Sequence, residues 1–245
     1  MTFEKVSKGN PEQLVMDQHF HTAHSIAKFY NNQDKVQVKI LSSGEVVLRD
    51  KRAKIFCAKR NWDERAERGY MTNIEHAYHN EIDSIQTFTK RNHTAISEYF
   101  LLWKFRHEYH LNRIDDEKLN VITGSELSKD QQERLEKNAI GYIKEDGYVP
   151  ARQMTGLRIQ MSIMQLMHEL ENVQWGLLQA TKGHFLSADS YQNLRLIPIS
   201  PKYAFAADYQ DQFVSYKELA QINKQSVDSA VEFYFGKDLT KCPIV

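Results

Sequence analysis

The stretch Leu157-Arg-Ile-Gln-Met-Ser-Ile-Met-Gln-Leu-Met-His-Glu-Leu170 places apolar side chains on most faces of an α-helix. Met161, Met164 and Met167 follow Leu157 at intervals of three or four residues, and two isoleucines fall between them. A helix that is apolar on most sides is normally buried. The pattern therefore predicts that this segment is the central helix of the fold.

Other segments have the apolar spacing or the start signals of helices. They run from Trp62 to about residue 89, around Ile96–Trp103, from Ser128 to about Ile143, and from about Tyr216 to Tyr234. Ser128 and Gln131 have the spacing of a capping box, in which each side chain satisfies a backbone N–H of the first turn. The chain is thus expected to be rich in helices.

Strand patterns interrupt the helices at two places. Val36, Val38 and Ile40 alternate with polar residues, and Val46 and Leu48 alternate after a Ser-Ser-Gly turn. Apolar residues with a period of two on both sides of a glycine-containing turn predict a β-hairpin. We expect it to form a small insertion at about residues 35–58.

The second strand region is expected at about residues 174–200. Trp175–Leu178 and His184–Ser187 flank a Thr181–Gly183 turn, which predicts another hairpin. Leu194–Ile197 precedes two prolines and is expected as an edge strand. The patterns together predict a mainly α, α+β fold: a helical core with two small antiparallel β-hairpins or sheets, in a single domain over residues 1–245.

Composition restricts the class of protein. Lys+Arg and Asp+Glu each number 32, so the formal net charge is zero, which argues against a wholly electrostatic binder of nucleic acid or membranes. Cys57 and Cys242 are too few for a disulfide framework. The N-terminus has no signal-peptide pattern, and no apolar run is long enough to cross a bilayer. We expect a cytoplasmic protein without a membrane partner.

Three histidines lie close together near the N-terminus. His19, His21 and His24 have the His-x-His-x-x-His spacing of the first zinc motif of the metallo-β-lactamase superfamily. The aspartate of that motif is replaced by Ala23, and on a helix His19 would not share the face of the other two. The spacing alone therefore does not predict a zinc site.

A different resemblance covers nearly the whole chain. Gln18-His-Phe20, with Ile26 and Phe29 behind it, resembles the opening of an uncharacterised, mostly bacterial family catalogued as domain of unknown function 4238. Phe185–Ser190 is similar to the family's Phe-Ile-Thr-Ser-Asp-Asn-Pro segment, and Ile197–Pro201 to its Phe-Pro-Leu-Ser-Pro segment. The family has no histidine at the next two positions of the cluster, so the resemblance leaves His19 as its candidate functional residue.

Further matches lie between these segments. Phe56–Trp62 resembles the family's Phe-Ala-x-x-x-Asn-aromatic segment, Glu75 and Glu81 match its acidic helix, and Arg106 lies where the family commonly has arginine. Asn223 falls in the closing helix. The family's reaction is unknown, but its members occur in mobile and defence-like genomic settings. The resemblance therefore implies a phage-defence or toxin-like role without naming the chemistry.

Polar residues inside otherwise apolar segments are the candidate site residues, because burying an unpaired polar group is costly. We expect His19 to act as an acid or base and Arg106 to hold a phosphate. Glu75, Glu81 and Asp189 offer oxygen ligands to Mg²⁺ or Mn²⁺. The full set is catalytic His19, Glu75, Arg106 and Asp189; metal-binding Glu75, Glu81 and Asp189; and ligand-binding Gln18, Asn223 and Arg60.

Each of these residues also has a structural explanation. Glu75 and Arg106 can form a buried salt bridge, and Asp189 can cap a turn. Asn223 can anchor the backbone, and His19 can satisfy a carbonyl group. Both explanations stay open at the level of sequence.

The functional hypothesis is a metal-dependent hydrolase, most specifically a nuclease with a phage-defence or toxin-like effector role. A nucleic acid would then be its substrate. The basic run from Arg49 to Arg68 can contact a phosphate backbone, although a solvated, salt-bridged surface is the commoner explanation of such a run. The alternative is a non-catalytic sensor or binding module that recognises a small anionic ligand or a phage protein. A protein partner or a homo-oligomer fits either hypothesis.

Overall fold

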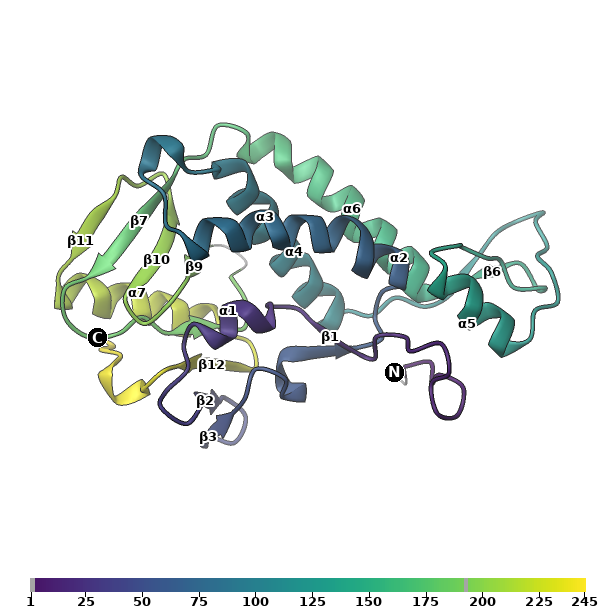
Figure 1. The fold of residues 1–245 in the computed structure, drawn as a ribbon, viewed down its shortest axis with the longest axis horizontal. Helices are drawn as coiled ribbons and strands as arrows, with labels where there is room; N and C mark the ends of the chain where they lie inside the picture. Colours follow the sequence, from purple (N-terminus) through teal and green to yellow (C-terminus); the bar gives the residue numbers. More distant parts are fainter. Residues whose placement is uncertain (1–2, 192–193) are drawn as a thin grey trace.

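The computed structural model describes residues 3–191 and 194–245 and shows a mixed α+β fold (Figure 1). About 40% of the chain is helical and 18% is strand, which is close to the average for soluble domains. The described strands form two four-stranded and two two-stranded sheets. The prediction of a mainly α fold with two small hairpins is therefore wrong, because strands far apart in the sequence pair with one another.

The described helices vary from a single turn to 20 residues. They are α1 Ala23–Ala27, α2 Glu64–Ala66, α3 Thr72–Asp83, α4 His93–Leu111, α5 Lys129–Lys137, α6 Ala151–Leu170 and α7 Tyr216–Ser229. A π-type turn over Glu67–Met71 joins α2 to α3, and short 3-10 turns cover Lys54–Phe56, Phe88–Lys90 and Leu239–Lys241. The capping box of Ser128 and Gln131 is confirmed at the start of α5.

The central helix is α4 and not α6. Helix α4 packs against both α3 and α6, and most of its side chains are buried. Helix α6 buries Ile159 and Ile163 on one face, whereas Leu157, Met161 and Met164 are 41%, 49% and 69% exposed. Helix α6 thus has more apolar faces than the rest of the fold buries, so the prediction that it is the central helix is wrong.

The first four-stranded sheet has the order β3-β2-β12-β8. Its strands are β2 Val36–Ile40, β3 Val46–Arg49, β8 Ser187–Ala188 and β12 Phe233–Gly236. The predicted hairpin of the first two is confirmed. Helix α7 ends at Ser229, earlier than expected, because Phe233 and Phe235 alternate into the core and pair with Ile40 and Val38 of β2.

The second four-stranded sheet has the order β11-β7-β10-β9 and lies at the left end of the molecule in Figure 1. Its strands are β7 Trp175–Ala180, β9 Leu196–Pro198, β10 Tyr203–Ala207 and β11 Gln212–Val214. The edge position of β9 is confirmed. The predicted hairpin between residues 175–178 and 184–187 is wrong, because β7 pairs with β10 and β11 while β8 belongs to the other sheet.

Two small sheets complete the fold. Strand β1 (Asp17–His19) pairs antiparallel with β4 (Cys57–Lys59), and β5 (Glu117–Lys118) pairs with β6 (Tyr148–Val149). The β1–β4 pair brings the N-terminal segment beside α4, where Phe20 joins the hydrophobic core. Within residues 3–191 and 194–245, no helix combines the length and apolarity needed to span a bilayer.

Candidate metal centre

Two histidines of α4 lie at the centre of the candidate site. His107 and His110 are three residues apart on the helix, so their side chains share a face. The ring of Phe20 packs edge-on against His107 at a centroid distance of 5.1 Å and in a tilted arrangement against His110 at 5.4 Å. The side chain of His107 is completely buried, whereas that of His110 is 23% exposed.

Asp189, which directly follows β8, is held by backbone groups. Its Oδ1 accepts a hydrogen bond from the Val231 N–H at 2.9 Å, and its Oδ2 accepts from Glu232 at 2.6 Å and Phe233 at 3.0 Å. The indole Nε1 of Trp103 on α4 donates to the Asp189 carbonyl at 3.0 Å. Asp189 therefore holds the turn before β12 through its carboxylate and contacts α4 through its backbone carbonyl.

This turn places the side chain of Glu232 beside the α4 histidines. His107 Nε2 lies 3.6 Å from Asp189 Oδ2, and His110 Nε2 lies 3.5 Å from Glu232 Oε2. One ligand atom from each of His107, Asp189 and Glu232 lies within 4.8 Å of the other two. Glu232 is half-exposed, so the group is buried on one side and open to solvent on the other.

The polar atoms of His107 are unsatisfied. Among the described residues, neither ring nitrogen of this buried histidine has a hydrogen-bond partner. Buried polar groups almost always have a partner, and an exception indicates a water or an ion. Imidazole nitrogen and carboxylate oxygen are common ligands of divalent transition metals. The arrangement can therefore hold a divalent cation.

A cavity of about 360 Å³ opens beside this group. Its walls are formed by Ile40, Ser42, Lys54, Ile55, Cys57, His110, Val231 and Glu232. The cavity thus joins the exposed half of the candidate metal centre to a lysine of the basic segment that begins at Arg49. A negatively charged group can approach along this side.

The ionisation of two cavity residues limits the chemistry. The hydrogen bond from His110 lowers the pKa of Glu232, so this carboxylate is ionised at neutral pH and favours a cation. Burial raises the pKa of Cys57 to about 12. A cysteine acts as a nucleophile in its thiolate form, so Cys57 is not a suitable nucleophile at neutral pH.

The structure does not bring the expected metal ligands together. Among the described residues, the group of potential ligand atoms that meets within 4.8 Å contains Asp189 but not Glu75 or Glu81. Glu75 instead forms an ion pair with Arg106. Glu81 is buried near the end of α3, and its Oε2 has no described hydrogen-bond partner. Asp189 thus has different partners from those that the sequence predicted.

Arg106 lies between α3 and α4 as a structural cation. Its guanidinium, only 1% exposed, contacts Glu75, lies 3.5 Å from Glu67 Oε2 and lies 5.2 Å above the Trp62 ring. Burial raises the pKa of Glu67, while the neighbouring Arg106 lowers it. These contacts fit the salt-bridge alternative better than a phosphate clamp.

Gln18 and His19 are also bound to the backbone. Gln18 donates to the Trp62 carbonyl at 2.8 Å and accepts from the N–H groups of Asn61 at 2.6 Å and Trp62 at 3.1 Å. The Nε2 of His19 lies 2.7 Å from the Lys51 carbonyl oxygen. The three N-terminal histidines separate, because His21 stacks on Trp103 and His24 pairs with Asp83.

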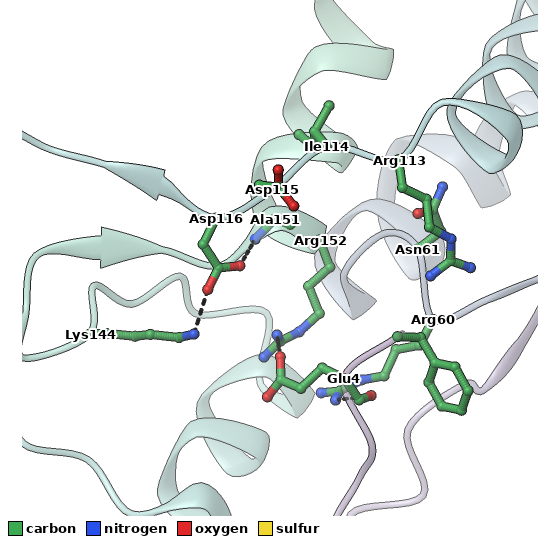
Figure 2. Close-up of a pocket in the computed structure, with 11 residues that line it drawn as sticks. Glu4, Arg60, Asn61, Arg113, Ile114, Asp115, Asp116, Lys144, Ala151 and Arg152 are labelled. Atoms are coloured by element: carbon green, nitrogen blue, oxygen red, sulfur yellow. Dashed lines mark hydrogen bonds and ion pairs between the residues drawn. The ribbon is translucent and has the colours of Figure 1, made fainter. Parts of the chain in front are cut away.

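Asn223 and Arg60 lie elsewhere. Asn223 is completely buried on α7, accepts a hydrogen bond from the Leu186 N–H and donates to the carbonyls of His184 and Pro243. It is therefore a backbone anchor. Arg60 lines a second cavity, between the N-terminal segment and the start of α6 (Figure 2).

His107, His110 and Glu232 were not identified from the sequence. The His-x-x-His spacing within an apolar helix was the available signal, because residues three apart share a helix face. Glu232 had no such signal. Its position depends on the backbone contacts between Asp189 and the turn before β12.

No protein-family model matches this chain, no curated protein matches it, and no solved structure matches its fold. The resemblance to domain of unknown function 4238 therefore stays a prediction from short motifs. Any functional conclusion depends on the geometry of the site.

Proposed function

We propose that this protein is a metal-dependent hydrolase, most specifically a nuclease, with a divalent cation held by His107, Asp189 and Glu232. The observation that carries the proposal is His107, a completely buried histidine without a described hydrogen-bond partner that faces a buried carboxylate. Asp189 Oδ2, the oxygen 3.6 Å from His107, accepts two N–H groups, whereas Oδ1 accepts one and retains a lone pair for a cation. His110 is close enough to Glu232 to orient it or to join the ligands.

The ligand chemistry favours Mn²⁺ or Zn²⁺. Imidazole nitrogen suits transition metals, whereas Mg²⁺ is usually bound through carboxylates and water. Of the two ions expected from the sequence, Mn²⁺ thus fits better than Mg²⁺. When held by His107, Asp189 and Glu232, such a cation would make a water molecule acidic enough to serve as the nucleophile in phosphodiester hydrolysis.

The surroundings support a polyanionic substrate. Lys54 lines the cavity beside Glu232, and two exposed arginines lie nearby in sequence, Arg49 at the end of β3 and Arg52 after it. Cationic side chains beside an open metal centre attract and orient a phosphate backbone. Since the whole chain has no net charge, these residues would provide local attraction.

We further propose a cytoplasmic effector in phage defence or in a toxin-like system. The free Cys57 and Cys242 fit a reducing compartment. The effector role is supported by the family resemblance, whose members occur in defence-like genomic settings. It is consistent with a nucleic acid as the substrate.

The test combines metal binding with cleavage. Titration of Mn²⁺ or Zn²⁺ into the protein should show one site, weakened at least about tenfold by Glu232→Gln because half-exposed Glu232 supplies a ligand but little packing. Cleavage of total RNA, plasmid and single-stranded DNA should depend on the same ions and stop with chelator. His168→Gln, on an exposed histidine of α6, is the matched control and should change neither result.

Two outcomes would contradict the proposal in different ways. Equal metal affinity in the wild type and Glu232→Gln would exclude this centre. Metal binding at the centre without cleavage of any of the three substrates would instead favour the non-catalytic sensor or binding module.

A further inference from the structure

A second site is indicated by three arginines that converge on the cavity of about 340 Å³ shown in Figure 2. Arg60 follows β4, Arg113 follows α4, and Arg152 lies in the first turn of α6. Asn61, Lys144, Asp115 and Asp116 complete most of the polar lining. The cavity lies apart from the candidate metal centre, with which it shares no lining residue.

Two of the guanidinium groups are buried and share one carboxylate. The side chains of Arg60 and Arg152 are 1% and 4% exposed. Their nitrogens lie 2.7 Å and 2.6 Å from the same oxygen, Oε2 of buried Glu136. Burying two cations with one anion is unfavourable unless another negative group is supplied.

The N-terminal segment supplies that group through Glu4. Its carboxylate pairs with Arg152, and its carbonyl oxygen accepts a hydrogen bond from Arg60 at 3.3 Å. Figure 2 shows the Glu4 side chain between these two arginines. Glu4 is 38% exposed, so a soluble anion can reach Arg152 and displace it.

The cavity also has donors that are not used. The Nε of buried Arg60 has no hydrogen-bond partner among the described residues. Arg113 donates to the Lys59 carbonyl at 2.9 Å and forms no ion pair among residues 3–191 and 194–245. Burial lowers the pKa of Arg113.

We propose that this cavity binds a small phosphate monoester and that the Glu4 carboxylate occupies the phosphate position in the free protein. Without Glu4, Arg60, Arg113, Arg152 and Lys144 carry four positive charges against three negative charges on Glu136, Asp115 and Asp116, so the cavity keeps a net positive charge. A phosphate monoester carries about −1.5 to −2 at neutral pH and accepts hydrogen bonds from several directions, so it suits this positive cavity and the guanidinium groups that line it.

The rim of the cavity indicates the rest of the ligand. Asp115 and Asp116 are exposed carboxylates at this rim, and Asp116 pairs with Lys144 at 2.5 Å. Carboxylates accept hydrogen bonds from hydroxyl groups. The volume lies at the small end of the range for ligand pockets, so the ligand is a phosphorylated sugar or a mononucleotide and not a polymer.

Calorimetric titration with inorganic phosphate and with AMP tests the proposal, with adenosine as the uncharged probe. Phosphate and AMP should bind and adenosine should not. Glu4→Gln should bind phosphate at least about fivefold more tightly than the wild type, because the substitution removes the competing carboxylate. Substitution of a residue that contacts a ligand usually weakens binding instead. Arg113→Gln should weaken binding at least about tenfold.

The controls separate this site from general effects. Lys217→Gln removes an exposed cation of α7 outside the cavity and should bind phosphate like the wild type. Circular dichroism should show that all variants are folded. The proposal is overturned if Glu4→Gln does not bind phosphate more tightly than the wild type, or if Arg113→Gln and Lys217→Gln have the same effect. Glu232→Gln should leave phosphate affinity unchanged, so failure of the metal centre and failure of this site are distinguishable.

Discussion

Replacing Arg106 by methionine tests whether this cation stabilises the fold or serves a reaction. In the structure its guanidinium is buried, contacts Glu75, lies 3.5 Å from Glu67 and covers the Trp62 ring. Methionine retains much of the volume and removes the charge. Two acidic side chains then remain without their shared partner.

The expected cost is about 3–5 kcal/mol of the free energy of unfolding, as for other buried ion pairs that lose one member. The lower end is expected, because Glu75 and Glu67 are 22% and 21% exposed and can gain water. Glu75→Gln should cost less, about 1.5 kcal/mol, since Arg106 then keeps Glu67 as a partner.

The pH dependence identifies the cause. Burial already raises the pKa of Glu67 and Arg106 opposes this, so without Arg106 the folded state holds its proton to higher pH. An acid with a raised folded-state pKa makes stability fall as pH rises from its unfolded to its folded pKa. Arg106→Met should therefore lose more stability near about pH 8 than near about pH 5.

Urea denaturation followed by circular dichroism measures these differences for the wild type, both single variants and the double variant. A loss below about 1 kcal/mol for Arg106→Met, or one independent of pH, would refute the structural role. Normal stability combined with lost cleavage would assign Arg106 to the reaction after all.

Three other predictions concern buried polar groups. Burial raises the pKa of Asp63 to about 6 from its ordinary 3.8. The folded state then keeps a proton that the unfolded state loses, so the wild-type Asp63 carboxyl lowers stability as the pH rises. Asp63→Asn retains a capping oxygen and removes this loss. Its free energy of unfolding in urea titrations should exceed that of the wild type by up to about 3 kcal/mol near pH 8 and by about half of that near pH 5. Equal gains in stability at the two pH values would show that the raised pKa of Asp63 is not the cause. Burial lowers the pKa of His21 to about 3 from 6.5, so the unfolded state alone takes up a proton as pH falls and stability is lost between these values. His21→Asn keeps an acceptor for the Tyr99 hydroxyl, and its stability should fall less than that of the wild type as the pH is lowered. An equal fall in both proteins would show that His21 does not cause this loss of stability. Asn223→Ala removes three hydrogen bonds to buried backbone groups and should cost about 3 kcal/mol or more by chemical denaturation, whereas exposed Asn172→Ala should cost little. A small loss at Asn223 would show that it is not the anchor of α7.

Local features of the fold were predictable because they depend on neighbouring residues. The β2–β3 hairpin follows from alternation around Ser42–Gly44, and the start of α5 follows from Ser128 and Gln131. The missed elements depend on distant pairing. Strand β12 forms because Phe235 meets Val38 on one side and Ser187 on the other, and no local spacing records that contact.

For the candidate site residues, burial was partly predictable from the sequence, but the binding partners were not. From the sequence alone, Asp189 and Asn223 were recognised as polar residues within apolar segments and Gln18 through the family resemblance, and all three are buried. The sequence did not determine what they bind. Gln18 and Asn223 satisfy backbone groups, whereas Asp189 also lies beside His107.

The sequence by itself determined where local turns and helix starts occur, because turns and capping depend on residue type and short spacing. It did not determine which apolar residues are buried, since Leu157, Met161 and Met164 of α6 are exposed. Only the tertiary structure decided that Asp189 faces His107 and Glu232 and not Glu75 or Glu81. The turn before β12 brings a carboxylate to α4 through backbone hydrogen bonds across more than 40 residues. Such contacts form between segments that are brought together by packing, so their partners depend on the whole fold.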